Sequence, residues 1–324
     1  MKSQLSLSVC LALLAAGGLW AADNNPAFTS AKEAGTDFAI QGEYTGSAGD
    51  HTWGAQVIAL GDGKFDLVGY RGGLPGEGWK RGDETRKATG EANKDGVATL
   101  KGDTFTVSVK EGVATVTGAG GEKLGELKKV ERKSPTLGAK PPAGAKVLFD
   151  GTTADNFANG KIIEENLLAA SGAESKLKLG DHTLHVEFRT PFMPLSRGQA
   201  RGNSGVYIQG RYELQVLDSF GLEGENNECG GIYSIGKPAV NMCLPPLAWQ
   251  TYDIDYKAAK YDADGKKTEN ARVTIKHNGV VIHDDLELTK GTPGHHPEGP
   301  EKDSLFLQDH GNPVAFRNIW VVEK

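Results

Sequence analysis

The sequence predicts an all-β protein in which a small antiparallel β module precedes a β-sandwich. Short runs of alternating apolar and polar residues recur along the 324 residues, and Gly, Asn and Pro separate them. Helical periodicity is almost absent, and 44 Gly against 3 Met is the composition of a turn-rich β protein. Antiparallel strands without helices must cover their apolar faces with one another, which favours two packed sheets.

Residues 1–21 are predicted to be a secretory signal peptide. Lys2 precedes an apolar run that ends at Leu19, and small residues follow up to Ala21. An uncleaved anchor is the alternative, but the run is short for a span of about 20 residues and Gly17-Gly18 interrupts it. We therefore expect a secreted or periplasmic protein without membrane contact after removal of the signal.

Residues 22–130 are predicted to form the small β module. Two pairs of β-prone runs flank short turns, one around Asp62 and one at Glu111-Gly112, and both are hairpin signals. Trp79 lies in a glycine-rich stretch and is expected to be exposed in a loop. It could stack on a sugar ring, although such aromatic residues are more often core or loop anchors.

Residues 131–145 are predicted to be a linker, because Pro, Gly, Ala and Lys dominate and apolar side chains are scarce. A second domain, the sandwich, is expected over residues 146–324. Its runs are short and β-prone, and Asn278-Gly279 between two of them is a strong two-residue hairpin turn.

The stretch from Arg201 to Gly221 carries unusually many polar side chains at strand positions. These are Arg201, Asn203, Gln209, Glu213, Gln215 and Asp218. Buried polar groups without partners cost free energy, so a strand that served only the core would not contain them. The pattern indicates one wall of a sugar-binding cleft.

The catalytic roles within this hairpin depend on its register. If Gly210-Arg211 is a tight turn, Glu213 and Gln215 share a face with Val206 and Ile208, and a single bulge would change this assignment. Glu213 and Asp218 could form an acid/base pair if the strand bends between them. The alternative for Glu213 is a structural ion pair with Arg211.

A second polar stretch, Leu305 to Val321, contains His310 after Asp309 and then Arg317. A histidine beside a carboxylate can act as a general base near neutral pH, but Asp309 and His310 could equally build a turn. Between the two stretches, Tyr233 and Trp249 are candidates for binding a sugar ring, with a core position as the default for Trp249.

Other classes of site are not expected. The chain contains no P-loop, GxGxxG after a strand, GxSxG or HExxH motif, which argues against nucleotide and cofactor binding. Its net charge of −6 argues against nucleic-acid binding. His295-His296 are expected to be exposed in a Gly/Pro-rich loop, with a metal site as the minority alternative. Cys229 and Cys243 are either a disulfide or two buried thiols, with neither favoured.

From Lys146 to Lys324 the chain resembles the 3-keto-disaccharide hydrolase domain family, which is common in secreted proteins of planctomycetes and related bacteria. The resemblance rests on the ordered motifs VLFDG, RGNSGVYIQGRYELQVLDSFG, NNECGGIY, PPLAWQTYDIDY, HNGVVIHDD and LQDHGNPVAFRNIWV. It implies a concanavalin-like jelly-roll sandwich, the architecture of laminarinase-type glucanases. Gln215 stands where those glucanases carry the middle carboxylate of the catalytic strand, and Phe157 stands where many members have Trp.

The resemblance also implies a chemistry that suits an amide at position 215. A ketone at sugar C3 acidifies the C2 proton, so that a base can start β-elimination of the C1 substituent, and water addition completes hydrolysis. The candidates are Glu213 or His310 as base or acid, and Arg201, Asn203 and Gln215 as donors to the enolate. A non-catalytic carbohydrate-binding protein on the same sandwich is the alternative, and an ordinary retaining glycosidase is less favoured because of Gln215.

Overall fold

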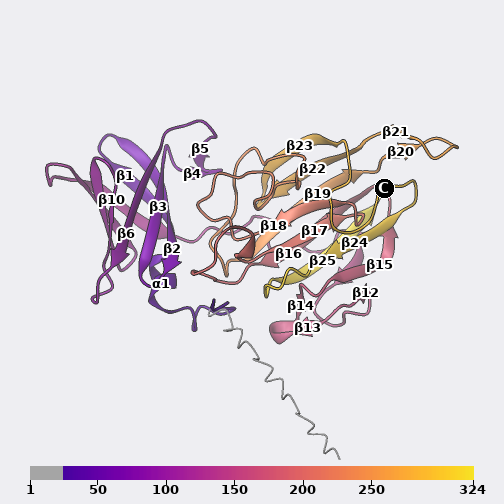
Figure 1. The fold of residues 1–324 in the computed structure, drawn as a ribbon, viewed down its shortest axis with the longest axis horizontal. Coiled ribbons are helices and arrows are strands. Elements are labelled where there is room, and N and C mark those ends of the chain that lie inside the picture. Colours follow the sequence, from indigo (N-terminus) through magenta and orange to yellow (C-terminus); the bar gives the residue numbers. More distant parts are fainter. Residues whose placement is uncertain (1–24) are drawn as a thin grey trace, which may run out of the picture.

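The computed structural model describes residues 25–324, and the predicted signal peptide lies outside them. A closed β-barrel comes first and a two-sheet sandwich follows (Figure 1). The predicted all-β class, a small antiparallel module followed by a sandwich, is thereby confirmed.

The barrel contains eight antiparallel strands in the closed order β1-β10-β9-β8-β7-β6-β3-β2. The strands are β1 (Gly42–Ala48), β2 (His51–Gly61), β3 (Lys64–Arg71), β6 (Thr85–Ala92), β7 (Ala98–Lys101), β8 (Phe105–Lys110), β9 (Val113–Gly118) and β10 (Lys123–Val130), with the helix α1 (Gly35–Ile40) before them and the short parallel pair β4 (Leu74–Pro75) and β5 (Gly78–Trp79) between β3 and β6. Both predicted hairpins are confirmed, because Gly61 pairs with Lys64 and Lys110 pairs with Val113.

The sandwich consists of an eight-stranded and a five-stranded sheet. The larger sheet has the order β13 (Ile162–Ile163), β14 (Leu167–Ala169), β25 (Ala315–Glu323), β16 (His182–Arg189), β19 (Gln250–Lys257), β22 (Ala271–His277) and β23 (Val280–Leu288), and β11 (Lys146–Phe149) also pairs with β25. The smaller sheet has the order β12 (Phe157–Ala158), β15 (Ala173–Leu179), β24 (Asp303–Leu307), β17 (Ser204–Ile208) and β18 (Tyr212–Val216). Two 3-10 turns, Glu164–Asn166 and Gly198–Ala200, and the small ribbon β20 (Lys260–Tyr261) with β21 (Lys267–Glu269) complete the elements.

The apolar core lies between these two sheets. Alternate residues of β17, β18 and β24 point into it, and Val206, Leu214 and Leu307 are fully buried. Val186 and Phe316 approach from the larger sheet. Because side chains alternate along a strand, the residues between these core positions lie on the outer face of the smaller sheet.

The register of the β17–β18 hairpin differs from the two-residue turn considered above. Ile208 pairs with Tyr212 and Tyr207 pairs with Glu213, so three residues, 209–211, form the turn. Two of them have left-handed backbone angles, with φ of 51° at Gln209 and 62° at Gly210. The extra turn residue moves Val206 and Ile208 into the core and places Tyr207 on the same outer face as Glu213. The Asn278-Gly279 turn, in contrast, is the predicted two-residue hairpin, with His277 paired to Val280.

The barrel packs against the sandwich through apolar residues. Ile58, Val68, Tyr70 and Trp79 belong to the same buried cluster as the sandwich core. Trp79 is 9% exposed and packs edge-on against Tyr70, which corrects its expected exposure in a loop. Arg81 also donates to the backbone carbonyls of the sandwich loops at Glu223, Gly224, Pro238 and Ala239.

The segment 131–145 lies across the outer face of the larger sheet. Thr136 Oγ1 donates to Asp253 at 2.6 Å, and the carbonyl of Ala139 accepts from Asn318 Nδ2 at 3.0 Å. These contacts tie the segment to β19 and β25. The domain boundaries that the sequence suggests stay a prediction.

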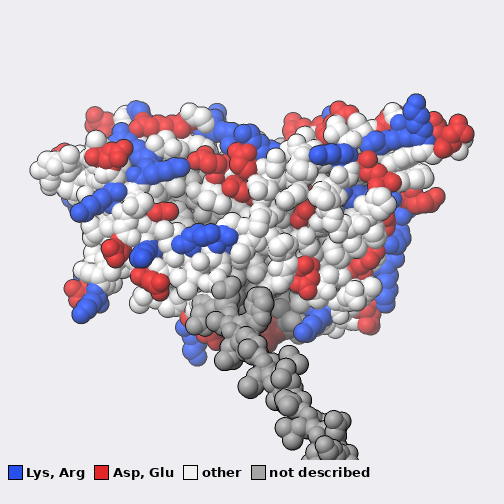
Figure 2. All heavy atoms as spheres, viewed as in Figure 1, with Lys and Arg blue, Asp and Glu red and all other residues white. Residues whose placement is uncertain are grey.

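In the described part of the chain, no helix has the length and apolar character needed to cross a membrane. Figure 2 shows acidic and basic side chains interspersed over the visible face of both the barrel and the sandwich.

Candidate active site on the five-stranded sheet

Glu213 is a buried carboxylate on the outer face of the smaller sheet, and only 4% of it is exposed. Tyr207 Oη, directly across the hairpin, donates a hydrogen bond of 2.9 Å to Glu213 Oε2. No ion pair with Glu213 forms within residues 25–324. A buried carboxylate without a cation is unusual, because its charged form is poorly solvated.

This environment shifts the proton affinity of Glu213. Burial raises its pKa to about 7, and the hydrogen bond from Tyr207 offsets only part of this effect. Carboxyl groups with a pKa near the working pH are suited to proton transfer. Elsewhere in the fold the buried Glu43 has a cationic partner, since Arg132 Nε donates to it at 2.7 Å.

The local sequence makes room for the carboxylate through Gly205 of β17. A Cβ at Gly205 would stand 2.6 Å from Glu213 Oε1 and 3.0 Å from Tyr207 Cε2. Gln215 pairs with Gly205 on one side, and Gln308 donates its backbone N–H to the Gly205 carbonyl on the other. Gly205 therefore lies at the base of a cluster of polar side chains from β17, β18 and the end of β24.

Three amide side chains around Gly205 have acceptor oxygens that accept no hydrogen bond from the described residues: Asn203 Oδ1, Gln215 Oε1 and Gln308 Oε1. Their nitrogens are engaged instead, since Gln215 Nε2 donates to Gln199 Oε1 at 3.0 Å and Gln308 Nε2 donates to Tyr207 Oη at 3.2 Å. Buried acceptors without donors are rare in folded proteins. Sugar hydroxyl groups are donors that would satisfy them.

Two further candidates border this group. The backbone N–H of Tyr233 donates to the Glu213 carbonyl at 3.0 Å. His310 is exposed in the turn after β24, where the neighbouring Asn312 Oδ1 accepts from the Asn203 N–H at 2.8 Å. No hydrogen bond in the described chain joins His310 to Glu213. The fold thus gathers Asn203, Glu213, Gln215 and Tyr233, with His310 at the end of the neighbouring strand.

Arg201 and Asp218 form a buried ion pair instead of joining Glu213. Arg201 Nε donates to Asp218 Oδ2 at 2.6 Å, and Arg201 Nη1 donates to the Ala59 carbonyl of the barrel at 3.2 Å. The pair therefore links the sandwich to β2. Gln209 is held by core contacts, with Nε2 bound to the Leu179 carbonyl and Oε1 accepting from Tyr256.

Trp249 and Arg317 meet on the other sheet. The Arg317 guanidinium lies 3.9 Å from the centre of the Trp249 ring, and its Nε donates to Glu187 at 2.7 Å. Burial alone would raise the pKa of Glu187, but hydrogen bonds from His185, Asn318 and Arg317 outweigh it and lower the pKa to about 2. Glu187 is thus a paired structural carboxylate. Clefts of about 660 and 580 Å³ border this group, the first at Arg317 and the second at Trp249.

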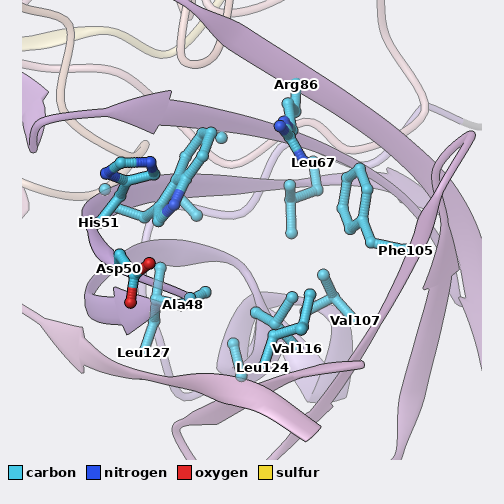
Figure 3. A pocket seen from close by; sticks show the side chains of 16 residues that line it. Ala48, Asp50, His51, Leu67, Arg86, Phe105, Val107, Val116, Leu124 and Leu127 are labelled. Carbon is cyan, nitrogen blue, oxygen red and sulfur yellow. The ribbon is translucent and has the colours of Figure 1, made fainter. Parts of the chain in front are cut away.

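The barrel has a separate cavity of about 310 Å³ at one end (Figure 3). Leu67, Phe105 and Leu127 point into it, and Asp50 and His51 lie at its rim. Its lining is mainly apolar, so it lacks the converging polar groups of the Glu213 site.

Cys229 and Cys243 are both buried free thiols in the structure. Cys229 Sγ lies 3.3 Å from Tyr252 Oη, and Cys243 Sγ is 3.5 Å from the Leu217 carbonyl.

Sequence reasoning missed the part played by Tyr207. Its position opposite Glu213 follows only from a three-residue turn, which the left-handed Gln209 makes possible. Gln199 was also missed, because it lies in a short 3-10 turn outside the strand pattern, yet it accepts from both Asn203 and Gln215.

Comparison with known proteins identifies the family of the sandwich. The 3-keto-alpha-glucoside-1,2-lyase-like domain family matches residues 144–322, more than half of the chain. The chain belongs to this family. Membership gives the protein a carbohydrate-active domain of hydrolase or lyase type and confirms the resemblance found in the sequence.

A solved structure of a proposed glycosyl hydrolase from Parabacteroides distasonis is 30% identical, with a TM-score of 0.51. The match covers 56% of this chain and 85% of that one. Two further proposed glycosyl hydrolases from the same species are 16% and 22% identical, with TM-scores of 0.42 and 0.41, and each match covers 56% of this chain and 94% or 99% of theirs. No curated protein matches the chain.

Proposed function

We propose that this protein cleaves the glycosidic bond of 3-keto-glycosides on the outer face of the five-stranded sheet. The observation that carries the proposal is Glu213, a buried and unpaired carboxylate whose pKa is raised to about 7, beside three unused acceptor oxygens. Membership in a 3-keto-glucoside lyase-like family supports the substrate class. Paired carboxylates such as Glu187 lack this proton-transfer capacity at neutral pH.

The reaction that suits one base and no second carboxylate is β-elimination. Glu213 removes the C2 proton, which the C3 ketone acidifies, and the electron pair forms the enolate. The enolate re-forms the ketone, a C1–C2 double bond appears, and the C1–O bond breaks. The departing oxygen takes a proton to give the free alcohol. Addition of water at C1 then yields the 3-keto sugar, so that the two steps amount to hydrolysis.

The surrounding side chains divide the remaining tasks. Tyr207 holds Glu213 in place through its hydrogen bond, and Gln215, Gln308 and Asn203 accept from sugar hydroxyl groups. We assign the acid that protonates the leaving oxygen to His310, which is exposed at the end of β24. Donors to the enolate were expected from Arg201, Asn203 and Gln215. Arg201 is paired with Asp218, and both amide nitrogens donate to Gln199, which leaves this task to other groups.

Turnover of 3-keto-disaccharides by purified protein and two variants tests the proposal. We expect Glu213→Gln to lower kcat/KM by at least about 100-fold, the usual contribution of a positioned base, and His310→Ala to lower it most for poor leaving groups. Glu287→Gln, on the exposed edge of β23, is the matched control and should retain activity. Unchanged turnover in Glu213→Gln would exclude it as the base. Sugar binding without any product from the wild type would favour the non-catalytic alternative.

Export belongs to the same proposal. The predicted signal peptide supports a secreted or periplasmic location, where environmental glycosides are available. N-terminal sequencing of protein produced in a bacterial host should find a chain that starts at Ala22. A chain that retains Met1 in the cytoplasm would contradict this location.

A further inference from the structure

A second group of polar side chains lies on the same outer face, outside the Glu213 site. Glu174 of β15 meets His295 and His296 from the loop 289–302, and one ligand atom from each lies within 4.8 Å of the others. We propose that Glu174, His295 and His296 bind a divalent transition-metal ion, with zinc as the best fit. From the sequence, a metal site at His295-His296 is only the minority alternative, because no local pattern places Glu174 beside the two histidines.

The distances are close to those of a metal site. Glu174 Oε2 lies 3.7 Å from His295 Nε2, and Glu174 Oε1 lies 3.9 Å from His296 Nε2. Ligands at typical zinc distances in a tetrahedral site are about 3.4 Å apart. The two imidazoles are stacked with an interplanar angle of 20°, so they would splay as their lone pairs converge on the ion. Side-chain movements of a few tenths of an ångström bring the two Glu174–histidine distances to this value, and the rings must also rotate so that both nitrogens face the ion.

The partners of His296 and Glu174 orient the ligand atoms. His296 Nδ1 lies 3.0 Å from Asp303 Oδ2, so that its N–H donates to the carboxylate while Nε2 is on the side of Glu174. A carboxylate behind a histidine ligand is a recurrent feature of zinc sites. Ser304 Oγ donates to Glu174 Oε1 at 2.6 Å. Lys178 Nζ lies 3.2 Å from Glu174 Oε1, and its charge opposes a cation there, but the lysine side chain is half exposed and can turn to solvent.

His295 is held ready for coordination. Its Nε2 is buried and has no hydrogen-bond partner among residues 25–324. The ring stacks on Phe306, with centroids 3.7 Å apart and an interplanar angle of 10°. Neutral imidazole is the form that binds metal ions, and an Nε2 atom without a competing partner is available to one.

The backbone also fixes the histidine loop. The His296 N–H donates to the Gly210 carbonyl at 2.8 Å, and Thr292 N–H donates to the Arg211 carbonyl at 2.8 Å. A Cβ at Gly210 would stand 2.7 Å from His296 Nδ1, so the bare turn makes room for the rings. Two imidazoles and one carboxylate favour zinc, cobalt or nickel over magnesium or calcium. Three protein ligands leave a fourth position for water or another small ligand.

Metal binding by the full mature chain tests this assignment without any assay of turnover. After chelator treatment, we expect one equivalent of Zn²⁺ by elemental analysis, and Co²⁺ should give the visible absorption of a tetrahedral site. His295→Phe keeps the stacking on Phe306, and Glu174→Gln keeps the contact with Ser304. Each should weaken Zn²⁺ binding by at least about 100-fold, since even second-shell changes typically cost about 10–100-fold.

His51→Ala, on the rim of the barrel cavity, is the matched control and should bind one equivalent of Zn²⁺. Circular dichroism and thermal unfolding of each metal-free variant establish that it is folded. The assignment is wrong if the wild type binds no Zn²⁺ at micromolar concentrations. It is equally wrong if folded His295→Phe and Glu174→Gln bind Zn²⁺ as the wild type does.

Discussion

Glu213 and Glu187 are both buried glutamates of the sandwich, and their surroundings move their pKa values in opposite directions. Burial dominates at Glu213 and raises its pKa to about 7, whereas at Glu187 four hydrogen-bond donors, including the Gly138 N–H, outweigh burial and lower the pKa to about 2. A free glutamate titrates near pH 4.3. The difference separates a carboxyl group that can transfer protons at neutral pH from one that stabilises the fold.

The two shifts have opposite effects on stability. Between about pH 4.3 and 7 only folded Glu213 keeps its proton, so its contribution to stability falls as the pH rises through this interval. Glu187 stabilises the fold above about pH 4.3, and this contribution is lost as the pH falls towards 2. Glu213 lowers the stability of the fold at neutral pH, and this cost indicates a functional role instead of a structural one.

Tyr207→Phe should move the pH dependence of turnover. The basic form of Glu213 is the active one, so kcat/KM should rise with pH through about 7 in the wild type. The hydrogen bond from Tyr207 lowers the Glu213 pKa, and its removal should therefore shift the rise to higher pH. Tyr233→Phe is the control, because it removes no hydrogen bond to the Glu213 carboxylate. An unshifted pH profile in Tyr207→Phe would mean that the group whose titration controls kcat/KM is not Glu213.

At the scale of the element, the three-residue turn of the β17–β18 hairpin decides which side chains face outwards. It pairs Tyr207 with Glu213 and Gly205 with Gln215, and it directs Val206 and Leu214 into the core. A two-residue turn would instead have placed Glu213 and Gln215 on the same face as Val206 and Ile208. The same turn also supports the histidine loop through its backbone carbonyls.

Gly205→Ala should disable the site while leaving the sheet intact. The new methyl group would come 2.6 Å from Glu213 Oε1 and must displace the carboxylate. We expect kcat/KM to fall at least about 10-fold and stability to fall by about 1–3 kcal/mol, the usual cost of overpacking. Turnover and urea unfolding measure the two effects. Gly69→Ala in the barrel has nearest neighbours at 3.6 Å and serves as the control. Full activity in folded Gly205→Ala would argue against the carboxylate's present position as the active one.

At the scale of the whole molecule, the barrel and the sandwich are joined by a common apolar cluster and by polar contacts. Tyr70 and Trp79 complete the core of the sandwich, and Arg201 reaches from its ion pair with Asp218 to the barrel carbonyl of Ala59. A change at this contact should therefore affect the stability of the fold more than the chemistry.

Asp218→Asn distinguishes a structural Asp218 from a catalytic one. It would leave Arg201 buried without its partner, which typically costs about 3–5 kcal/mol. Urea unfolding should show this loss, while folded protein at low temperature should keep kcat/KM within about threefold, because the expected change in the barrier stays below about 1 kcal/mol. Asp285→Asn breaks an exposed pair with Arg272 and should change stability by less than about 1 kcal/mol. A stable Asp218→Asn that loses turnover would restore the catalytic assignment.

The amino-acid sequence by itself determined the all-β class, the hairpin turns at Asp62, Glu111 and Asn278, and the polar character of the strand that carries Glu213. These properties depend on alternation and turn chemistry, which act over a few neighbouring residues. The amide at Gln215, and with it the argument against a two-carboxylate glycosidase, could also be read directly from the chain.

Only the tertiary structure decided which polar residues meet. It brought Gln308 beside Gly205, paired Arg201 with Asp218 against the barrel, and placed Arg317 on the opposite sheet from Glu213. It also brought Glu174 to two histidines that lie more than one hundred residues away in the chain. These contacts depend on strand order and on a single extra turn residue at 209–211, and no local pattern encodes either one.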